Sequence, residues 1–166
     1  FIILCTGELN KNKNQAKLIN AMKEVVKKHP EAKLLLAGNG PEHDNLVKLI
    51  EDLNLGDNVE LLGYRTDIQD YVNICDLVVS ASYREGLPLN IMEAMICGKP
   101  VIASDNRGHR ELIKNNKNGK LIKLDNNNGF ENSINSLIEN KKIANYLCKN
   151  ALEMIKPFSV ENIKEE

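Results

Sequence analysis

The chain has 166 residues, and its 22 Lys and Arg almost balance its 23 Asp and Glu, which leaves a formal net charge of −1. A chain of this length predicts one domain that buries roughly two thirds of its unfolded surface. The near-zero charge gives no electrostatic reason to expect nucleic acid or an anionic membrane as the main partner. No apolar run is long enough to span a bilayer, so no transmembrane segment is expected.

The cysteines lie far apart in the sequence and form no C-x-x-C pair: they are Cys5, Cys75, Cys97 and Cys148. This distribution favours reduced thiols over disulfides or a metal site. We therefore expect a cytoplasmic protein.

Apolar runs typical of buried strands alternate with segments whose apolar residues recur at helical spacing. Strands are predicted at residues 1–6, 33–37, 59–62, 77–80, 101–103 and 120–122. Helices are predicted at residues 15–29, over a segment carrying Leu46 to Leu53, at 67–74, at 88–97, and as two helices broken near Asn140 within 130–155. A last short helix is predicted after Pro157.

This alternation predicts an α/β fold: a doubly wound parallel sheet of about six strands with helices on both faces, followed by C-terminal helices. We expect residues 1–166 to form a single domain. Because the chain opens directly on an apolar strand, we also expect that domain to be a piece of a longer protein. Ligands of such sheets bind beyond the carboxyl ends of the strands. The informative loops are therefore those after Thr6, Ala37, Leu62, Ser80 and Ser104.

The segment SYREGLPLNIMEAM, residues 82–95, places two carboxylates beside an apolar helix. Pro88 suits the first turn of that helix, because its missing N–H costs nothing there. The free N–H groups that follow, on Leu89, Asn90 and Ile91, should face the crevice. A helix start in that position attracts anions, phosphate above all.

Each of the two carboxylates has two interpretations. Glu93 shares a narrow arc of the helix with Asn90 and Cys97, and the apolar residues around this stripe predict a helix buried on most sides. Either the stripe faces solvent, or Glu93 accepts hydrogen bonds from a bound polyol, each worth on the order of 1.5–3 kcal/mol. Glu85, in the preceding loop, is either an exposed acid or a group that reaches a ligand's hydroxyls.

These residues carry a resemblance to a known family. The span from Glu85 to Glu93, followed by residues 94–95 and 98–104, resembles the signature of retaining glycosyltransferases with the GT-B fold, glycosyltransferase family four. Further similar segments are Gly7 with residues 13–15, residues 38–41, 59–63 and 111–113. The resemblance covers roughly residues 1–155 and implies the Rossmann-like, C-terminal donor-binding half of the enzyme. The N-terminal acceptor domain would then be absent from this chain.

The resemblance also implies roles for particular residues. Glu85 and Lys13 would be the catalytic pair, with Glu85 on the donor-sugar hydroxyls and Lys13 on the diphosphate. Glu93 would hold the ribose hydroxyls. The other implied donor-binding residues are Gly7, Glu8, Gly38, Tyr64, Arg65, Gly86, Leu87, Pro88, Leu89 and Asn90, with Tyr64 and Arg65 beside the base. His109, expected in the loop after the fifth strand, and Arg107 are further candidates.

One position departs from the family pattern. Many members carry a basic residue where this chain has Glu8, which removes a positive charge near the phosphates. Arg107, Lys11 or Arg84 could compensate. Without the resemblance, Lys13 would read as an ordinary solvated loop lysine.

Several other site types are disfavoured. Gly38-Asn39-Gly40 is followed by His43 where a dinucleotide fingerprint needs its third glycine, and no G-x-x-x-x-G-K-[ST] loop or nucleophile elbow is present. Metal ligands do not cluster and no Asp-x-Asp pair occurs, so we expect no metal and no cofactor besides the donor substrate. Lys13 and helix N–H groups would neutralise the diphosphate.

The function implied for the full enzyme is transfer of a hexose from a UDP-sugar to a saccharide or lipid-linked acceptor, with retention of configuration, in polysaccharide assembly. We expect it in the cytoplasm or peripherally at the inner membrane surface, and we expect this chain alone to bind donor and transfer little. The alternatives are a nucleotide-sugar-binding module without turnover and a nucleotide-sugar epimerase of the same fold.

Overall fold

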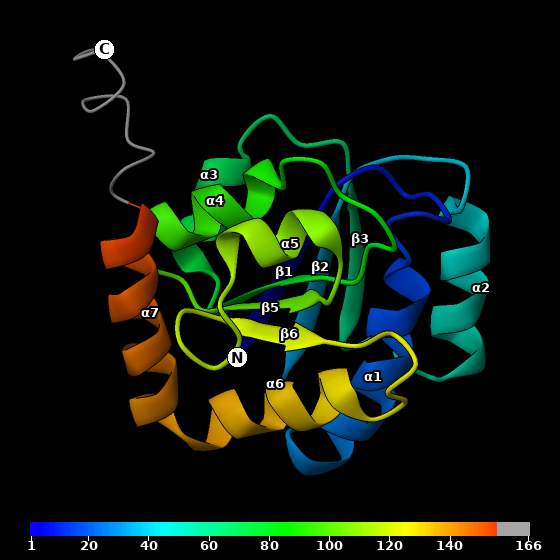
Figure 1. The fold of residues 1–166 in the computed structure, drawn as a ribbon. Coiled ribbons are helices and arrows are strands. Elements are labelled where there is room, and N and C mark those ends of the chain that lie inside the picture. The colour runs from blue at the N-terminus through cyan, green and yellow to red at the C-terminus, as the bar shows by residue number, and fades with distance from the viewer. Residues whose placement is uncertain (156–166) are drawn as a thin grey trace.

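A computed structural model describes residues 1–155 of the chain (Figure 1). Six strands form one sheet in the order β3-β2-β1-β4-β5-β6, and every neighbouring pair is parallel. The strands are β1 (Ile2–Thr6), β2 (Lys33–Ala37), β3 (Val59–Gly63), β4 (Leu77–Ser80), β5 (Val101–Ser104) and β6 (Lys120–Ile122). The predicted α/β fold with a six-stranded parallel sheet is confirmed.

Helices connect the strands and follow the last one. They are α1 (Gln15–Lys28), α2 (His43–Asp52), α3 (Ile68–Ile74), α4 (Leu89–Ile96), α5 (Arg107–Leu112), α6 (Gly129–Glu139) and α7 (Lys141–Ile155). The break predicted near Asn140 separates α6 from α7. The short helix predicted after Pro157 lies outside the described residues.

The α5 helix corrects the prediction of a loop after the fifth strand. Asn106 caps this helix, because its side-chain Oδ1 accepts a hydrogen bond from the His109 N–H at 3.1 Å. An Asn directly before a short helix is a recognised start signal. Six residues with few apolar positions were too short for periodicity to reveal the helix.

Each face of the sheet carries its own apolar core, because successive strand residues point to opposite faces. Ile3 and Cys5 of β1 belong to a cluster formed with α1, α2 and α6, whereas Leu4 belongs to a second cluster with α3, α4 and α5. The α7 helix reaches both clusters through Leu147 and Ala151. Fully burying one such aliphatic side chain contributes roughly 1.5–3 kcal/mol, so these layers hold the sheet rigid.

The α4 helix is less enclosed than its apolar sequence predicted. Ile91 and Met95 are buried against the sheet, but Leu89 and Ile96 are 60% and 54% exposed. Only the apolar side chains on the side of α4 that faces the sheet reach the core, because the helix packs against the sheet with one side only. The prediction of burial on most sides is therefore wrong, and the other sides of α4 are open to solvent.

The strand order positions the site. β1 and β4 are neighbours in the sheet, with Ile3 beside Leu77 and Leu4 beside Val78. The helices that follow them, α1 and α4, pack on opposite faces of the sheet. The loops after these strands consequently diverge, and in open α/β sheets a binding crevice forms at such a switch point.

The four cysteines are free, as predicted. Burial raises the pKa of the Cys5 thiol to about 12, so it behaves as an apolar core group. Within residues 1–155, no helix combines the length and apolar character that crossing a membrane requires.

Candidate functional site

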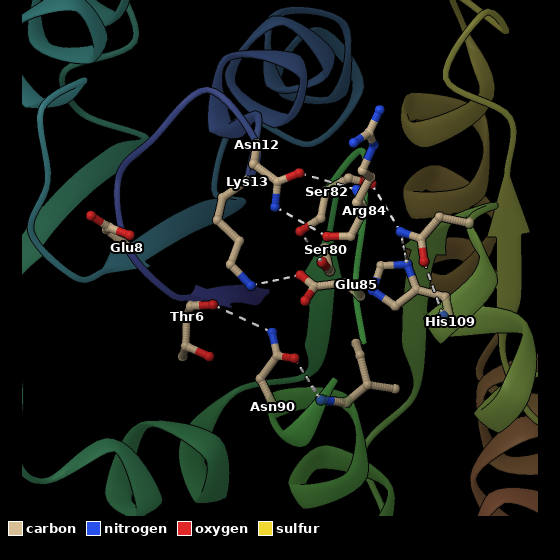
Figure 2. Close-up of polar contacts among 12 residues, drawn as sticks. Thr6, Glu8, Asn12, Lys13, Ser80, Ser82, Arg84, Glu85, Asn90 and His109 are labelled. Carbon is tan, nitrogen blue, oxygen red and sulfur yellow. Dashed lines mark hydrogen bonds and ion pairs between the residues drawn. The ribbon is translucent and has the colours of Figure 1, made fainter. Parts of the chain in front are cut away.

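Two charged side chains meet across the switch point of the sheet. Lys13 comes from the 7–14 loop after β1, and Glu85 comes from the 81–88 loop after β4. The Lys13 Nζ lies 2.6 Å from Glu85 Oε1, and the two side chains are 26% and 11% exposed (Figure 2). The structure thus brings together the two residues predicted to be catalytic, at the edge of the sheet where ligands bind.

Asn12 joins the two loops. Its Nδ2 donates to the Arg84 carbonyl at 3.0 Å, and its Oδ1 accepts from the Arg84 N–H at 3.1 Å. The Asn12 carbonyl also accepts from the Tyr83 N–H at 2.8 Å. Asn10 orients the lysine itself, because its Oδ1 accepts from the Lys13 N–H at 2.9 Å. These bonds hold the loops in the register that allows the ion pair.

The environment of Glu85 keeps its carboxylate charged. Burial by itself raises the pKa of this carboxyl, but hydrogen bonds from Lys13 and from the Ser82 side chain, together with the positive charge of Lys13, lower it. The net pKa lies below the ordinary value for glutamate. Glu85 is therefore an ionised acceptor at neutral pH, suited to accept hydrogen bonds from hydroxyl groups.

His109 lies elsewhere than predicted. It belongs to α5 rather than to a loop, and its side chain is fully buried. Its Nδ1 lies 2.7 Å from the Ser104 carbonyl oxygen, which assigns the ring proton to Nδ1, and its Nε2 has no hydrogen-bond partner among the described residues. Burial lowers the pKa of the imidazole, so the ring is neutral. His109 is therefore a buried residue next to the site and does not lie at the surface of the crevice.

The N–H groups at the start of α4 are only partly free. The helix begins at Leu89, with Pro88 as its N-cap residue. The Leu89 N–H donates to the Leu87 carbonyl and the Ile91 N–H to the Pro88 carbonyl, each at 3.0 Å. Of the three donors predicted to face a ligand, only that of Asn90 has no partner among the described residues.

Other free N–H donors lie in the loop just before the α4 helix. The N–H groups of Glu85, Gly86 and Leu87 form no hydrogen bond within residues 1–155. Gly86 and Leu87 are exposed, so these donors can reach a ligand without a rearrangement of the helix. Successive unpaired N–H groups next to a helix start favour an anion.

A cavity of about 330 Å³ opens beside the ion pair, at the carboxyl ends of β1, β2 and β3. Its lining residues are Thr6, Gly7, Glu8, Ala37, Gly38, Asn39, Tyr64, Arg65 and Ile68. We call it the β1–β3 cavity. Five residues predicted to bind the donor line it together, although they come from three separate loops.

Glycines bring two of these loops close together. Gly7 and Gly38 have φ values of 144° and 150°, which L side chains rarely adopt. A Cβ on Gly38 would collide with the Gly7 carbonyl. A Cβ on Gly7 would lie 3.4 Å from the Lys13 side chain, an ordinary van der Waals contact, so the positive φ rather than a lack of space favours glycine at this position.

The guanidinium of Arg65 is already engaged. Its Nε and Nη2 donate to the Asp67 carboxylate at 2.8 and 2.6 Å, and the group lies 5.2 Å from the Tyr71 ring centroid. The side-chain hydrogen bond from Arg65 holds the pKa of Asp67 below its usual range. Arg65 therefore forms part of the wall beside the exposed ring of Tyr64, and its charge is balanced locally.

Glu93 lies on the rim of the same region. One turn before it, Asn90 Nδ2 donates to the Thr6 carbonyl at 3.3 Å, and one turn after it, Cys97 Sγ accepts from Gln69 of α3 at 3.1 Å. This stripe of α4 therefore faces β1 and α3, whose residues line the β1–β3 cavity. Glu93 is exposed and forms no ion pair within the described residues.

The Glu8 side chain lies apart from the Lys13–Glu85 pair (Figure 2). Glu8 is exposed, its Oε2 accepts from Asn10 Nδ2 at 2.8 Å, and its carboxylate points away from Lys13 and Glu85 (Figure 2). Arg107 extends into solvent, 3.6 Å from the Glu111 carboxylate.

Sequence reasoning missed the residues that support the site, namely Asn12, Ser82, Ser104, Asn106 and Gly108. Their polar and small side chains resemble ordinary loop residues, and only Asn106 carried a recognisable signal as a helix cap. Residues 1–155 contain no group of three or more His, Cys, Asp or Glu side chains placed to hold a metal ion.

Fold and site together define a Rossmann-like domain whose binding crevice lies at the switch point of its sheet. The family described as "Glycosyl transferases group 1" matches residues 1–154, and the chain belongs to this family. It is similar to the putative glycosyltransferase EpsD of Bacillus subtilis (strain 168), with 36% identity over 100% of this chain and 44% of that protein.

Two solved structures share the fold. Anabaena Alr3699/HepE, in a crystal structure in complex with UDP-glucose, matches with a TM-score of 0.91 and 31% identity over 99% of this chain and 47% of that one. The C-terminal domain of the group 1 glycosyl transferase LpcC from Francisella tularensis matches with a TM-score of 0.88 over 96% of this chain and 87% of that one, at 22% identity. The resemblance to a GT-B C-terminal domain is confirmed, and the chain spans less than half the length of EpsD and HepE.

Proposed function

We propose that this chain is the donor-binding domain of a retaining glycosyltransferase that uses a UDP-sugar. The observation that carries the proposal is the Lys13–Glu85 pair at the switch point of the sheet, in the same crevice as the β1–β3 cavity and the free N–H groups of the 81–88 loop. A flat base, a diphosphate and a sugar have three different chemistries, and this crevice offers a matching environment for each. The binding of UDP-glucose by the structural relative HepE supports the same assignment.

The nucleoside occupies the β1–β3 cavity in this proposal. Its base lies beside Tyr64 and Arg65 and its ribose hydroxyls donate to Glu93, which the α4 stripe holds at the rim. Gly7 and Gly38 let the backbone approach closely. A charged carboxylate that accepts two ribose hydroxyls would contribute on the order of 1.5–3 kcal/mol per hydrogen bond.

The diphosphate lies against Lys13 and the N–H groups of Gly86, Leu87 and Asn90. When the bond between sugar and phosphate breaks, negative charge develops on the leaving nucleoside diphosphate. A fixed ammonium group and aligned N–H donors stabilise this charge without reorganising during the reaction. The sugar hydroxyls donate to Glu85, whose carboxylate is ionised and held in place.

The full protein would transfer a hexose to a saccharide or lipid-linked acceptor in polysaccharide assembly, with the acceptor held by a second, N-terminal domain. Retention of configuration and the identity of the sugar belong to the same proposal. On this account the isolated chain binds the donor and transfers little, because half of the catalytic cleft belongs to the other domain.

The test is calorimetric titration of the chain with UDP-glucose, GDP-glucose, ADP-glucose and UDP. We expect UDP-glucose to bind more tightly than the GDP and ADP sugars, and UDP to bind with part of that affinity. No binding of any of the four at millimolar concentration would overturn the proposal. Incubating the chain with UDP-glucose alone and analysing the sugar separates donor binding from epimerisation, which would produce an altered hexose.

A further inference from the structure

The 81–88 loop rests on residues that follow β5. Ser82 contributes the main contact: its carbonyl oxygen accepts from Ser104 Oγ at 2.5 Å and from Asn106 Nδ2 at 3.0 Å. Ser82 and Ser104 are buried, so the bond from Ser104 is shielded from water, and the bond from Asn106 is partly buried. The loop is therefore fixed to the residues after β5 at Ser82, three residues before Glu85.

The second contact is steric. Gly108, in the first turn of α5, lies directly under the backbone of the loop. A Cβ on Gly108 would lie 2.5 Å from the carbonyl oxygens of both Glu85 and Gly86, a distance that real Cβ atoms essentially never show. The height of these two carbonyls above α5 is consequently set by the absence of a side chain at Gly108.

His109 completes the support. Its buried ring contacts the Ser104 carbonyl oxygen through Nδ1 at 2.7 Å, and its backbone N–H donates to Asn106 Oδ1. The Asn106 side chain thus caps α5 with its oxygen and holds the 81–88 loop with its nitrogen. Figure 2 shows His109 on the side of Glu85 opposite Lys13.

We propose that this first turn of α5, through Asn106, Gly108 and His109, positions the carboxylate of Glu85 against Lys13 and the bound sugar. The three residues are positioning residues, since none of them touches the ligand in the proposed complex. This inference rests on the proposed function for its meaning in catalysis, but the geometry of the loop can be tested without a ligand.

This support from α5 explains how the exposed 81–88 loop can hold the Glu85 carboxylate in a defined position. Tyr83, Arg84, Gly86 and Leu87 are all exposed and contribute little packing. Asn12 fastens the loop on one side, and α5 fastens it from below. A binding carboxylate must be held close to its productive geometry by such supporting contacts.

The first variant is Gly108→Ala, with Gly56→Ala as its matched control because a Cβ on Gly56 would meet open space. Alanine favours the helix, so the melting temperature should change little while the added Cβ lifts the loop. We expect the Kd for UDP-glucose to rise by about tenfold or more and the Kd for UDP to rise less, since the base and ribose contacts lie elsewhere. The control should keep both values within about twofold.

The second variant is Asn106→Ser, which separates the two roles of Asn106. Serine still caps the helix with its oxygen and adds no charge, but it is too short to reach the Ser82 carbonyl. We expect UDP-glucose to bind several-fold more weakly at an unchanged melting temperature. If Gly108→Ala unfolds the chain, this variant decides the question.

The third readout needs no ligand. The pKa of Glu85, which can be followed by NMR of its labelled carboxyl carbon, lies below the ordinary value in the unaltered chain. In Gly108→Ala the pKa of Glu85 should change from that of the unaltered chain, because the displaced loop alters the geometry of the Lys13–Glu85 pair. Folded variants with an unchanged Glu85 pKa and unchanged UDP-glucose affinity would overturn the inference. If the unaltered chain binds neither UDP nor UDP-glucose, the proposed function fails, and the pKa shift alone decides whether α5 positions Glu85.

Discussion

Glu85 and Glu93 belong to the same short segment, yet their surroundings differ. Glu85 is mostly buried, paired with Lys13 at 2.6 Å, and carried by a loop that Asn12 and α5 hold from two sides. Glu93 is exposed on α4 and forms no ion pair within the described residues. One carboxylate is fixed before a ligand arrives, and the other is free to adapt to it.

This difference in surroundings fits the different roles that the proposed function gives to the two carboxylates. A group that must act on the reacting sugar benefits from being held in advance, because the ordering cost is then paid during folding. In the proposed function Glu93 only binds the ribose, which does not require a carboxylate that is fixed in advance. The predictions below separate the two carboxylates by asking which part of the ligand each one recognises.

The largest effect should come from Lys13→Ala. It removes the cation that faces the diphosphate and leaves the buried Glu85 carboxylate without its partner. We expect the affinities for UDP and UDP-glucose to fall together by about 50-fold, which corresponds to roughly 2–3 kcal/mol. Calorimetry on Lys48→Ala, an exposed lysine of α2, provides the control. Equal affinities for Lys13→Ala and the unaltered chain would remove the lysine from the site.

Glu85→Gln should act on the sugar and spare the nucleotide. The amide keeps the shape of the side chain but loses the charge that accepts the sugar hydroxyls, so UDP-glucose should bind about tenfold more weakly. UDP should change by no more than about threefold, because Lys13 remains available for the diphosphate. A parallel loss for both ligands would show that Glu85 contacts the nucleotide instead.

Glu93→Gln should instead weaken the binding of both ligands, with a smaller effect. An exposed, solvated carboxylate contributes less than a buried one, so we expect about a fivefold loss. Because ribose is common to both ligands, UDP and UDP-glucose should weaken equally. Glu153→Gln, on an exposed position of α7, is the matched control. A ratio of affinities that changes with Glu93→Gln would place this residue near the sugar.

The smallest effect should come from Glu8→Lys, which introduces the basic residue that the family resemblance led us to expect at this position. Glu8 lines the β1–β3 cavity but is exposed, so the gain should be about two- to fivefold for UDP at low salt. Titration at two ionic strengths checks this prediction, because the gain should shrink as salt screens the charge. A gain that is independent of salt would point to a contact other than a charge interaction.

The sequence predicted the layout of the fold well because strand and helix periods alternate regularly. Each predicted strand is present, and the loops chosen after Thr6 and Ser80 are those that carry Lys13 and Glu85. The position of ligands in open α/β sheets follows from topology, so this part of the site could be expected without coordinates.

The supporting residues could not be predicted in the same way. The contacts from Asn12 to Arg84 and from Asn106 to Ser82 join segments far apart in the chain, and a single sequence gives no information on such pairs. Local patterns also misplaced His109, because the short α5 helix has no clear periodicity. The apolar residues of α4 suggested burial that only the complete packing could refute, at Leu89 and Ile96.

The most direct measurement is a crystal structure of the chain soaked with UDP-glucose. We expect the uracil in the β1–β3 cavity, the diphosphate within hydrogen-bond distance of Lys13 Nζ and the Gly86 and Leu87 N–H groups, and glucose hydroxyls on Glu85. Density for UDP-glucose at any other surface, with the Lys13–Glu85 pair untouched, would contradict the account.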